Sequence, residues 1–446
     1  MYTAYNANVD AIVTLNGEMV QKLVDEFGAG EVRRRMEEYP REINEPIDFV
    51  ARLVLTLKVG KPAEVPLVNE ELGAWFDSHF KYDVQRMGGQ AGIISNLLSS
   101  LGLRKVLVHV PYLSKRQAEM FVRNSNLFYP TVEGGRLTLK HPIEAWREGD
   151  PVKVNRIFEF REGTTFKLGS ETVRVPYSGR FIVSSRFESI RIETRPELRP
   201  FLPEIGEMID GAILSGYQGI RLKYSDGKDA NYYLRKAKED IMLLKRGGAK
   251  VHVEFASIQS RELRKRVIYN VFPLADSVGM DEAEIAHVLN SLGYSSLAER
   301  IFDYNRIEDT VLGGKIILDE MNLELLQIHT IYYLMYIAPS DNPLTEKELE
   351  ESLITGTTLA AARASLGDIK SAADYEVGLK VPFNERGEYI RLRFEEARRR
   401  TKEHKVVIVP TRLVKHPVST VGLGDTISAG AFTRYLSLLR EKERGS

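Results

Sequence analysis

The sequence predicts an α/β protein, in which a large Rossmann-type α/β/α domain carries a smaller, sheet-rich lid domain. Over most of the chain, short apolar segments alternate with helix-like segments, as expected for a parallel sheet with helices on both faces. One internal segment instead alternates apolar and polar residues between Gly-containing turns, which is typical of a small antiparallel sheet. With 446 residues, 43% of them hydrophobic, the chain has enough apolar side chain for a sizeable core.

The elements of the large domain follow one another along the chain. An apolar helix over residues 91–101 leads into a buried strand over 105–110. Further buried strands are expected at 211–215, 251–255 and 406–409, with helices at 232–245 and 282–292 between them. We expect this domain to comprise residues 1–12, 88–150 and 187–446.

The lid is predicted to comprise residues 13–87 and 151–186. Helical patterns cover 19–26 and 47–57, and the extended segment 63–67 is assigned to the lid. Short strands are expected at 152–160, 164–168, 172–176 and 180–186. Because these strands interrupt the α/β pattern, we expect them to form an inserted lid.

The composition excludes several classes of protein. Lys and Arg together number 62, as do Asp and Glu, so no basic excess indicates nucleic acid or an anionic membrane as a partner. The absence of Cys excludes disulfides, thiolate zinc sites and Cys nucleophiles. The longest apolar segments, such as 331–338, are well short of the ~18 residues that span a bilayer, and no secretory signal is recognisable. We therefore expect a soluble, cytoplasmic protein.

Several common phosphate-binding and catalytic motifs are also missing from the sequence. None of the Gly-Lys pairs is followed by Ser or Thr, which excludes a Walker-type phosphate loop, and no GxGxxG follows a strand. HExxH and GxSxG are missing as well. Any phosphate chemistry must therefore use another scaffold.

The strongest local signal is Thr420-Val-Gly-Leu-Gly-Asp-Thr-Ile-Ser-Ala-Gly-Ala-Phe432, in which two glycines precede a small-residue helical pattern. The amides from Gly422 to Asp425 would lie at a helix N-terminus, which favours a bound anion. Asp425 beside such an anion hole is a candidate general base that takes a proton from a hydroxyl during phosphoryl transfer. The alternative is an Asp that caps a helix after a Gly turn.

Acidic residues follow two further expected strands. In Lys250-Val-His-Val-Glu-Phe255, His252 and Glu254 point to one face of the strand, at the end where α/β folds bind ligands. Asp281 and Glu284 share one face of a later helix start and, together with Glu254, are suited to hold a hydrated Mg²⁺. The alternatives are a solvated strand face and acidic partners of the helix dipole.

Polar side chains also mark the N-terminal strand. Asn6, Asn8 and Asp10 alternate with apolar residues, so they line one face of the expected first strand and suit a polyol ligand. A polar surface strand is the alternative. The segment Met87-Gly-Gly-Gln-Ala-Gly92 indicates a Gly turn of close approach before a helix.

Together these segments resemble the ADP-dependent sugar kinases of the ribokinase-like superfamily, with the archaeal phosphofructokinase branch closest. The resemblance covers essentially the whole chain and rests on NANVD, GGQAG, the HVE strand, DEAE in place of that family's NxxE motif, and GLGD. The longer segments REINEPIDFVARL, SDGKDANYYLR and VGLKVPFNER resemble that branch in particular. The resemblance implies a ribokinase-like fold and phosphoryl transfer from ADP to a sugar hydroxyl in glycolysis, with AMP as the second product.

The resemblance also implies roles at the transfer site. The catalytic group comprises a base and an anion hole, namely Asp425 and the amides of Gly422, Leu423 and Gly424. The acidic residues associated with Mg²⁺ are Glu254 and Glu284, with His252 beside them. Asp281 stands where the family has Asn, which leaves its role open.

The remaining matches concern the two substrates. The residues that match sugar-hydroxyl contacts are Asn8, Asp10, Gly88, Gly89 and Gln90. Lys153 and Arg186 match the basic residues that hold a sugar 6-phosphate in a pocket closed between lid and large domain. Arg180 is expected to reach the nucleotide phosphates from the lid, and Val421 and Gly424 lie on the nucleotide side. Without the resemblance, the three basic residues would be ordinary exposed sheet residues.

One residue departs from the phosphofructokinase pattern. Glu64 stands where that branch has a small apolar residue, and a carboxylate there resembles the glucokinase branch, in which Glu accepts a hydrogen bond from glucose. We therefore expect a kinase for both fructose 6-phosphate and glucose that works as a monomer or weak homo-oligomer. The alternatives are an ATP-dependent ribokinase-like sugar kinase and a catalytically silent sugar-binding or regulatory protein.

Overall fold

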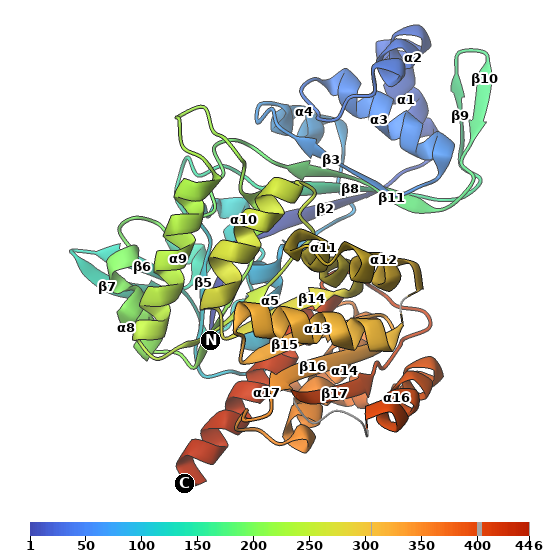
Figure 1. Ribbon diagram of the computed structural model, residues 1–446. Helices are drawn as coiled ribbons and strands as arrows, with labels where there is room; N and C mark the ends of the chain where they lie inside the picture. Colours follow the sequence, from blue (N-terminus) through green and yellow to red (C-terminus); the bar gives the residue numbers. More distant parts are fainter. Residues whose placement is uncertain (305, 399–403, 446) are drawn as a thin grey trace.

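A large β-sheet organises the bigger of two domains in the computed structural model, which describes residues 1–304, 306–398 and 404–445 (Figure 1). In spatial order its strands are β17 (His404–Pro410), β16 (Tyr333–Pro339), β15 (Leu325–His329), β14 (Ser277–Asp281), β13 (Lys250–Glu254), β12 (Gly211–Leu214), β1 (Tyr2–Ala4), β5 (Val106–His109), β6 (Leu127–Glu133) and β7 (Arg136–Lys140). The strands from β15 to β6 pair in parallel, and antiparallel pairing adds β16 and β17 at one edge and β7 at the other. The carboxyl ends of the parallel strands therefore meet at one edge of the sheet.

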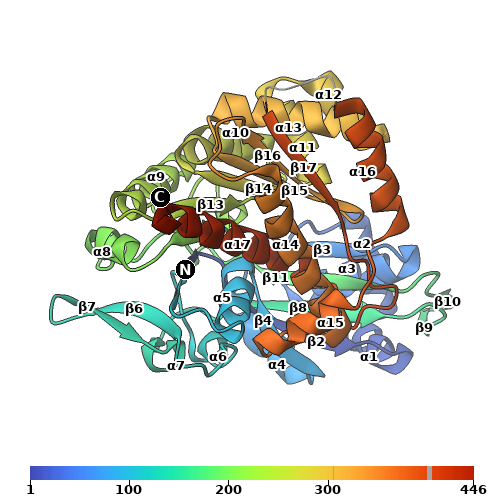
Figure 2. The same ribbon diagram turned by 90° about the horizontal axis from the view of Figure 1, so that it is seen from below.

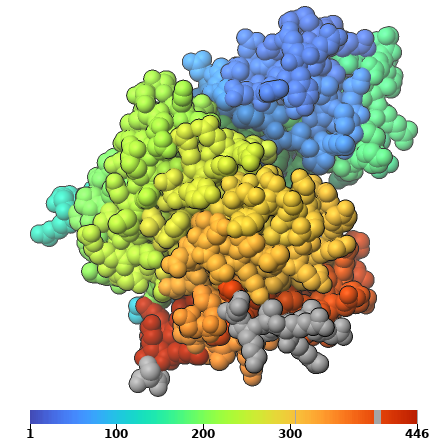
Figure 3. Space-filling model, viewed as in Figure 1, coloured from blue at the N-terminus to red at the C-terminus, as the bar shows by residue number. Residues whose placement is uncertain are grey.

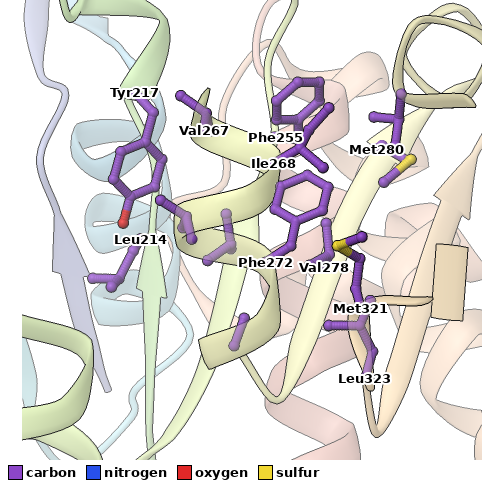
Figure 4. Packing of buried hydrophobic residues seen from close by; sticks show 14 of the residues in the cluster. Leu214, Tyr217, Phe255, Val267, Ile268, Phe272, Val278, Met280, Met321 and Leu323 are labelled. Carbon is purple, nitrogen blue, oxygen red and sulfur yellow. The ribbon is translucent and has the colours of Figure 1, made fainter. Parts of the chain in front are cut away.

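Helices cover both faces of this sheet, and strand alternation divides its side chains between two cores. Ala212 and Leu214 of β12 belong to one core, and Ile213 between them belongs to the other. The first core, seen closely in Figure 4, packs against α8 (Leu202–Glu207), α9 (Ala230–Arg246), α10 (Arg261–Val271), α11 (Glu282–Leu292), α12 (Ser295–Tyr304), α13 (Ile307–Met321) and α16 (Glu385–Arg398). The second packs against α5 (Gln90–Ser100), α14 (Glu346–Leu366) and α17 (Leu423–Gly445), which adjoin one another in Figure 2.

The lid is built on a second sheet with the strand order β3 (Ala63–Leu67), β11 (Gly179–Ser185), β8 (Val154–Phe160), β2 (Asn8–Thr14) and β4 (Val84–Gly88). Figure 1 shows α1 (Gly17–Phe27), α2 (Ala29–Glu38), α3 (Pro46–Val59) and α4 (Leu72–His79) on the side away from the large domain, with the hairpin of β9 (Thr165–Leu168) and β10 (Glu171–Arg174) beside them. Packed rings of Phe49, Phe76, Phe158 and Phe181 fill the space between this sheet and its helices. The other face of the lid sheet is turned toward the large domain.

The predicted α/β class with a smaller, sheet-rich domain is confirmed. The remaining helices are short: α6 (Lys115–Ala118), α7 (Pro142–Ala145) and α15 (Tyr375–Leu379). Within the described ranges, no helix combines the length and apolar character that crossing a membrane requires.

The lid sheet is mixed, whereas the sequence predicted an antiparallel one. β8 and β11 are antiparallel, as expected from their short connection through the β9–β10 hairpin. However, β2 runs parallel to β8, and β3 runs parallel to β11. These parallel partners come from a distant, earlier part of the chain, so no hairpin constrains their direction.

The expected first strand is divided between the two domains. β1 ends at Ala4 in the large sheet, and β2 begins at Asn8 in the lid sheet. Asn6 therefore lies in the connection between the domains and not on one strand with Asn8 and Asp10. The lid sheet accordingly begins at Asn8, earlier than the predicted start of the lid at residue 13.

Asp48 fixes the start of α3 in the lid. Its buried carboxylate accepts hydrogen bonds from the backbone N–H groups of Asn44 and Glu45, both at 2.9 Å, and from Arg35 Nε at 2.6 Å. Two backbone N–H groups just before the helix and one arginine side chain therefore depend on this carboxylate for a hydrogen bond.

We predict that Asp48→Ala lowers the free energy of unfolding of the lid by about 3 kcal/mol, because it removes the partner of two part-buried backbone donors and of the Arg35 guanidinium. Thermal and urea unfolding, followed by circular dichroism, measure the loss. Glu38→Ala, which removes a surface partner of the same Arg35, is the matched control and should change stability little. Equal effects of the two substitutions would contradict this role.

Candidate active site

The cleft between the two domains contains a cavity of about 750 Å³. Its lid side includes Glu64, Lys153 and Arg186, and residues 218–223 and 257–260 form much of its large-domain side. In the space-filling view the lid, in blue, rests over the large domain at this boundary (Figure 3). Three residues predicted to bind substrate therefore line one cavity.

One face of the lid sheet carries the predicted lid residues. Asp10 of β2 is opposite Arg86 of β4 and Asn155 of β8, and Asn155 is opposite Ser184 of β11. Because opposed side chains share a face and successive ones alternate, this face can be followed across the sheet. It carries Asn8, Asp10, Glu64, Arg86, Gly88 and Arg180, and it continues to Lys153 and Arg186 just beyond the strand ends.

Asn8 and Asp10 form a buried polar pair at the start of β2. Asn8 Nδ2 donates a hydrogen bond of 2.7 Å to Asp10 Oδ1, and both side chains are at most 5% exposed. Burial raises the pKa of Asp10, while the hydrogen bond from Asn8 and the charges of Arg86 and Arg180 oppose the rise. The pair presents a carboxylate and an amide oxygen, which suit sugar hydroxyl groups.

Glycines let the chain pass close to this pair. A Cβ at Gly88 would overlap the carboxylate of Asp10 and the amide of Asn8. Gly89 has φ +76°, and a Cβ there would lie 2.7 Å from the backbone oxygen of Asn6. Gln90 then begins α5, and its Oε1 accepts a 3.3 Å hydrogen bond from Gln218 Nε2.

A basic pair lies beside Glu64 in the cavity. Burial first, and the charge of Arg186 second, lower the pKa of Lys153 to about 7, while Glu64 opposes the shift. Lys153 Nζ donates to Asn6 Oδ1, and Arg186 Nη2 lies 3.8 Å from Glu64 Oε1. Because desolvation disfavours the charged form of Lys153, an anion bound beside it would stabilise that form.

The GLGD segment forms a tight turn into α17. Gly422 has φ +72°, and a Cβ there would lie 2.9 Å from Ile93 Cδ1, so glycine is required by both conformation and space. The N–H and hydroxyl of Thr426 donate to the oxygen of Gly422 at 2.9 and 2.7 Å. The helix begins at Leu423. Its first amides have no partner within the helix and are suited to bind an anion.

Asp425 lies in the first turn of α17. Burial raises the pKa of its carboxyl to about 7, the negative charges of Glu254 and Asp10 add to the rise, and the guanidinium of Arg363 opposes it. A carboxylate of that basicity is suited to take a proton near neutral pH. Asp10 and the GLGD turn are also linked by geometry, because Arg86, opposite Asp10 in the lid sheet, donates a hydrogen bond of 3.3 Å to Ser419.

His252 and Glu254 form a buried hydrogen-bonded pair at the end of β13. His252 Nδ1 lies 2.9 Å from Ser277 Oγ, and its Nε2 lies 3.1 Å from Glu254 Oε2. Burial lowers the pKa of His252 to about 3 and raises that of Glu254 to about 7. A neutral His252 with both ring nitrogens engaged orients Glu254, and this arrangement leaves it no free nitrogen for a metal.

Asp281 and Glu284 form a capping box at the start of α11. The Asp281 N–H donates to Glu284 Oε2 at 2.9 Å, and the Glu284 N–H donates to Asp281 Oδ1 at 2.8 Å. Burial raises the pKa of Glu284 well above its ordinary value, and the charges of Asp281, Glu254 and Asp425 raise it further. Asp281 thus has a clear structural role here.

The carboxylates supply hard oxygen donors and an excess of negative charge, both of which suit Mg²⁺. In the described part of the chain, no three His, Asp or Glu side chains are already grouped to hold a metal ion directly. Glu254 and Glu284 therefore fit a hydrated Mg²⁺, which keeps several waters.

Sequence reasoning missed four residues near these groups. Arg363 of α14 donates to the Val421 oxygen at 3.1 Å, Arg221 donates to the backbone oxygen of Arg186, and Arg86 shares the face of Asp10. His329, at the end of β15, lies so close to Gly424 that a Cβ there would be 3.1 Å from its Nε2. No motif marks the arginines, but the strand-end position of His329 could have indicated it if β15 had been predicted.

Both the sequence and the fold are similar to those of known proteins. The family described as "ADP-specific Phosphofructokinase/Glucokinase conserved region" matches residues 1–434. The ADP-specific phosphofructokinase of Thermococcus zilligii is 77% identical over 445 residues, which are 99% of this chain and 96% of that protein. A crystal structure of a phosphofructokinase from Pyrococcus horikoshii OT3 with AMP is similar with a TM-score of 0.94 at 65% identity, covering 99% and 98% of the two chains. An ADP-dependent kinase in complex with fructose-6-phosphate and ADPβS is similar with a TM-score of 0.83 at 42% identity, covering 98% and 93%.

The raised pKa of the Asp425 carboxyl leads to a prediction about stability. Its pKa of about 7 in the folded chain lies above the value of about 4 for an unfolded aspartate, so the folded state loses stability as pH rises between these values. Asp425→Asn should therefore raise the melting temperature of the ligand-free, Mg²⁺-free protein at pH 8 and change it little near pH 4. Calorimetry at the two pH values provides the measurement. A melting temperature lowered equally at both would show that the carboxylate stabilises the fold.

Proposed function

Because the chain belongs to the ADP-specific phosphofructokinase/glucokinase family, we propose that it is a kinase that transfers the β-phosphoryl group of ADP to fructose 6-phosphate. The products are fructose 1,6-bisphosphate and AMP, and the reaction is a step of glycolysis. We propose that the same site also phosphorylates glucose to glucose 6-phosphate. The cytoplasm, where ADP and sugar phosphates occur, is the expected compartment, and a monomer or weak homo-oligomer remains the expected state.

The observation that carries this proposal is the nearness of the Asp10 strand to the GLGD turn, since Arg86, which is opposite Asp10, donates a hydrogen bond of 3.3 Å to Ser419 just before that turn. Asp425 and the amides of the GLGD turn come from the large domain, and Asp10, whose charge acts on Asp425, comes from the lid. A base, an anion hole and a sugar-hydroxyl pair are the parts that phosphoryl transfer to a sugar requires. The intact set argues against a catalytically silent sugar-binding protein.

The chemistry follows from the positions of these groups. Asp425 takes the proton of the acceptor hydroxyl, whose oxygen forms a bond to the β-phosphorus of ADP. The bond from that phosphorus to the bridging oxygen breaks, and AMP leaves with the electron pair. The amides of Gly422, Leu423 and Gly424 donate to the phosphoryl oxygens as charge develops on them.

Glu254 and Glu284 are the residues that would hold Mg²⁺, and the ion would neutralise negative charge on the diphosphate when bound. His252 supports this group by holding Glu254 in place. Asp281 fixes the backbone from which Glu284 projects.

The proposed sugar 6-phosphate site is the basic pair in the cavity. Lys153 and Arg186 offer two cations, and Arg221 supports the backbone of Arg186. An anion neutralises the buried Lys153 and replaces the mutual repulsion of the two cations with attraction. When glucose is bound instead, no phosphate reaches this pair, and Glu64 is free to accept a hydrogen bond from a sugar hydroxyl.

We further propose that the lid closes over the bound substrates. The cavity is open at the domain boundary, and water would compete with the sugar hydroxyl unless it is excluded. Arg180, on the same lid face, would approach the nucleotide phosphates in this movement.

The proposed function is tested by a kinetic comparison of fructose 6-phosphate and glucose, each with ADP and with ATP, in an assay that follows the nucleotide product. We expect turnover with ADP and both sugars, and AMP as the nucleotide product. Turnover with ATP alone would instead indicate an ATP-dependent sugar kinase, and no turnover with either nucleotide would indicate a binding protein.

The role of Asp425 predicts that Asp425→Ala lowers kcat by about three orders of magnitude or more, because general-base catalysis and the alignment of the acceptor are both lost. The folded state should persist, as judged by the circular dichroism spectrum. Retention of full activity by this variant would contradict the assignment of the base.

The role of Glu64 predicts that Glu64→Ala lowers kcat/KM for glucose about tenfold or more and that for fructose 6-phosphate much less. The reason is that glucose loses a hydrogen bond to a charged acceptor, whereas the 6-phosphate keeps Lys153 and Arg186. Glu42→Ala removes another carboxylate that lines the same cavity and is the matched control. An equal loss on both sugars would mean that Glu64 acts only on the structure of the site.

A further inference from the structure

The peptide of Val421, directly before the anion hole, is held from two sides. Arg363 Nε donates to the Val421 oxygen at 3.1 Å, and the Val421 N–H donates to Ser419 Oγ at 3.3 Å. Arg363 is itself buried and fixed by Asp368, with Nη1 3.1 Å from Oδ1. The large domain therefore anchors one side of this peptide directly.

The N–H group of Val421 is linked to the lid through Ser419. Ser419 Oγ, which accepts from Val421, also accepts a 3.3 Å hydrogen bond from Arg86 Nη1. Arg86 lies on β4 opposite Asp10, so its side chain leaves the lid sheet on the face that carries the sugar-hydroxyl pair. The chain of contacts thus runs from the lid sheet through Arg86 and Ser419 to the turn that carries the catalytic amides.

The charge of Arg86 affects titratable groups in both domains. It lowers the pKa of Asp10 in the lid and that of Arg363 in the large domain, and its guanidinium reaches from β4 to Ser419. Its Nε is buried and, within the residues described, has no hydrogen-bond partner. A buried donor without a partner is unfavourable, so Arg86 does not have its full set of hydrogen bonds in this arrangement.

We propose that Arg86 is a positioning residue through which the lid sets the anion-hole turn for phosphoryl transfer. This inference rests on the proposed kinase function. When the lid moves onto its substrates, Arg86 moves with β4 and shifts Ser419 through their hydrogen bond. Arg363 meanwhile keeps the Val421 oxygen in place. The amides from Gly422 to Gly424 then take their catalytic positions only when the sugar side of the cleft is closed.

The test is a double-mutant cycle between Arg86→Gln and Ser419→Ala, with kcat, KM and melting temperature measured for all four proteins on ADP and fructose 6-phosphate. Each single substitution should lower kcat about tenfold with little change in KM, and the double variant should be no worse than either single one. The melting temperature should change little in all three variants, whereas a merely structural contact would lower stability and kcat together. Arg174→Gln, on the distant β10 hairpin, is the matched control and should retain full kcat.

Additive losses in kcat, or a loss in kcat that only follows the loss of stability, would overturn this inference. If Arg86→Gln does not fold, Arg86→Lys replaces it in the cycle, since it keeps the charge beside Asp10 but lacks the planar fork. An inactive native protein would refute the proposed kinase function, whereas an active native protein with an additive cycle would refute only the role of Arg86.

Discussion

The geometry of the site depends above all on Asn6, which lies in the segment that connects the large sheet to the lid sheet. The backbone oxygen of Asn6 accepts hydrogen bonds from Ala91 and Gly92 at the start of α5, and its side chain accepts one from Lys153. Gly89 approaches it from one side and Gly216 from another, where a Cβ would lie 2.9 Å from Asn6 Cβ. The Asn8–Asp10 pair, the Gly turn and Lys153 are therefore positioned relative to one residue, and we expect the proposed lid movement to pivot there.

Side chains of like charge are grouped at the cleft, with carboxylates on one side and basic residues on the other. Four carboxylates, Asp425, Glu254, Glu284 and Asp10, lie near one another, and desolvation is the largest cause of the raised pKa of each. Neighbouring negative charges add to the rise for Asp425, Glu254 and Glu284. Arg363 and Arg86 offset part of this repulsion from opposite domains. On the sugar-phosphate side the signs are reversed, and Lys153 and Arg186 repel each other beside one carboxylate. The protein thus groups like charges where the proposed substrates and Mg²⁺ would supply the opposite ones, which is why a formal net charge of zero reveals nothing about the site.

Much of the fold could be predicted from local pattern, because strands such as β5 and β13 and helices such as α9 and α11 combine buried apolar runs with clear ends. The edge strands and the mixed order of the lid sheet could not, since they depend on which distant segments pair. Among site residues, Asp425 and Glu254 stand in short motifs, whereas Arg363 and Arg86 act through folded geometry alone. The same reason explains the error at Asn6, where an alternating pattern continues through a change of sheet.

The lid sheet is assembled from pieces that the chain supplies far apart, since β2 begins at Asn8 but its partner β8 begins at Val154. During synthesis, the large domain's strands β5 to β7 emerge before β8 and β11 can complete the lid. The lid core must therefore wait, with Phe49 and Phe76 lacking their partners Phe158 and Phe181, until residue 185 has been made. The interruption therefore leaves the first aromatic residues of the lid without their partners while the intervening part of the large domain is made, and the large domain itself is completed only later, with β12 to β17.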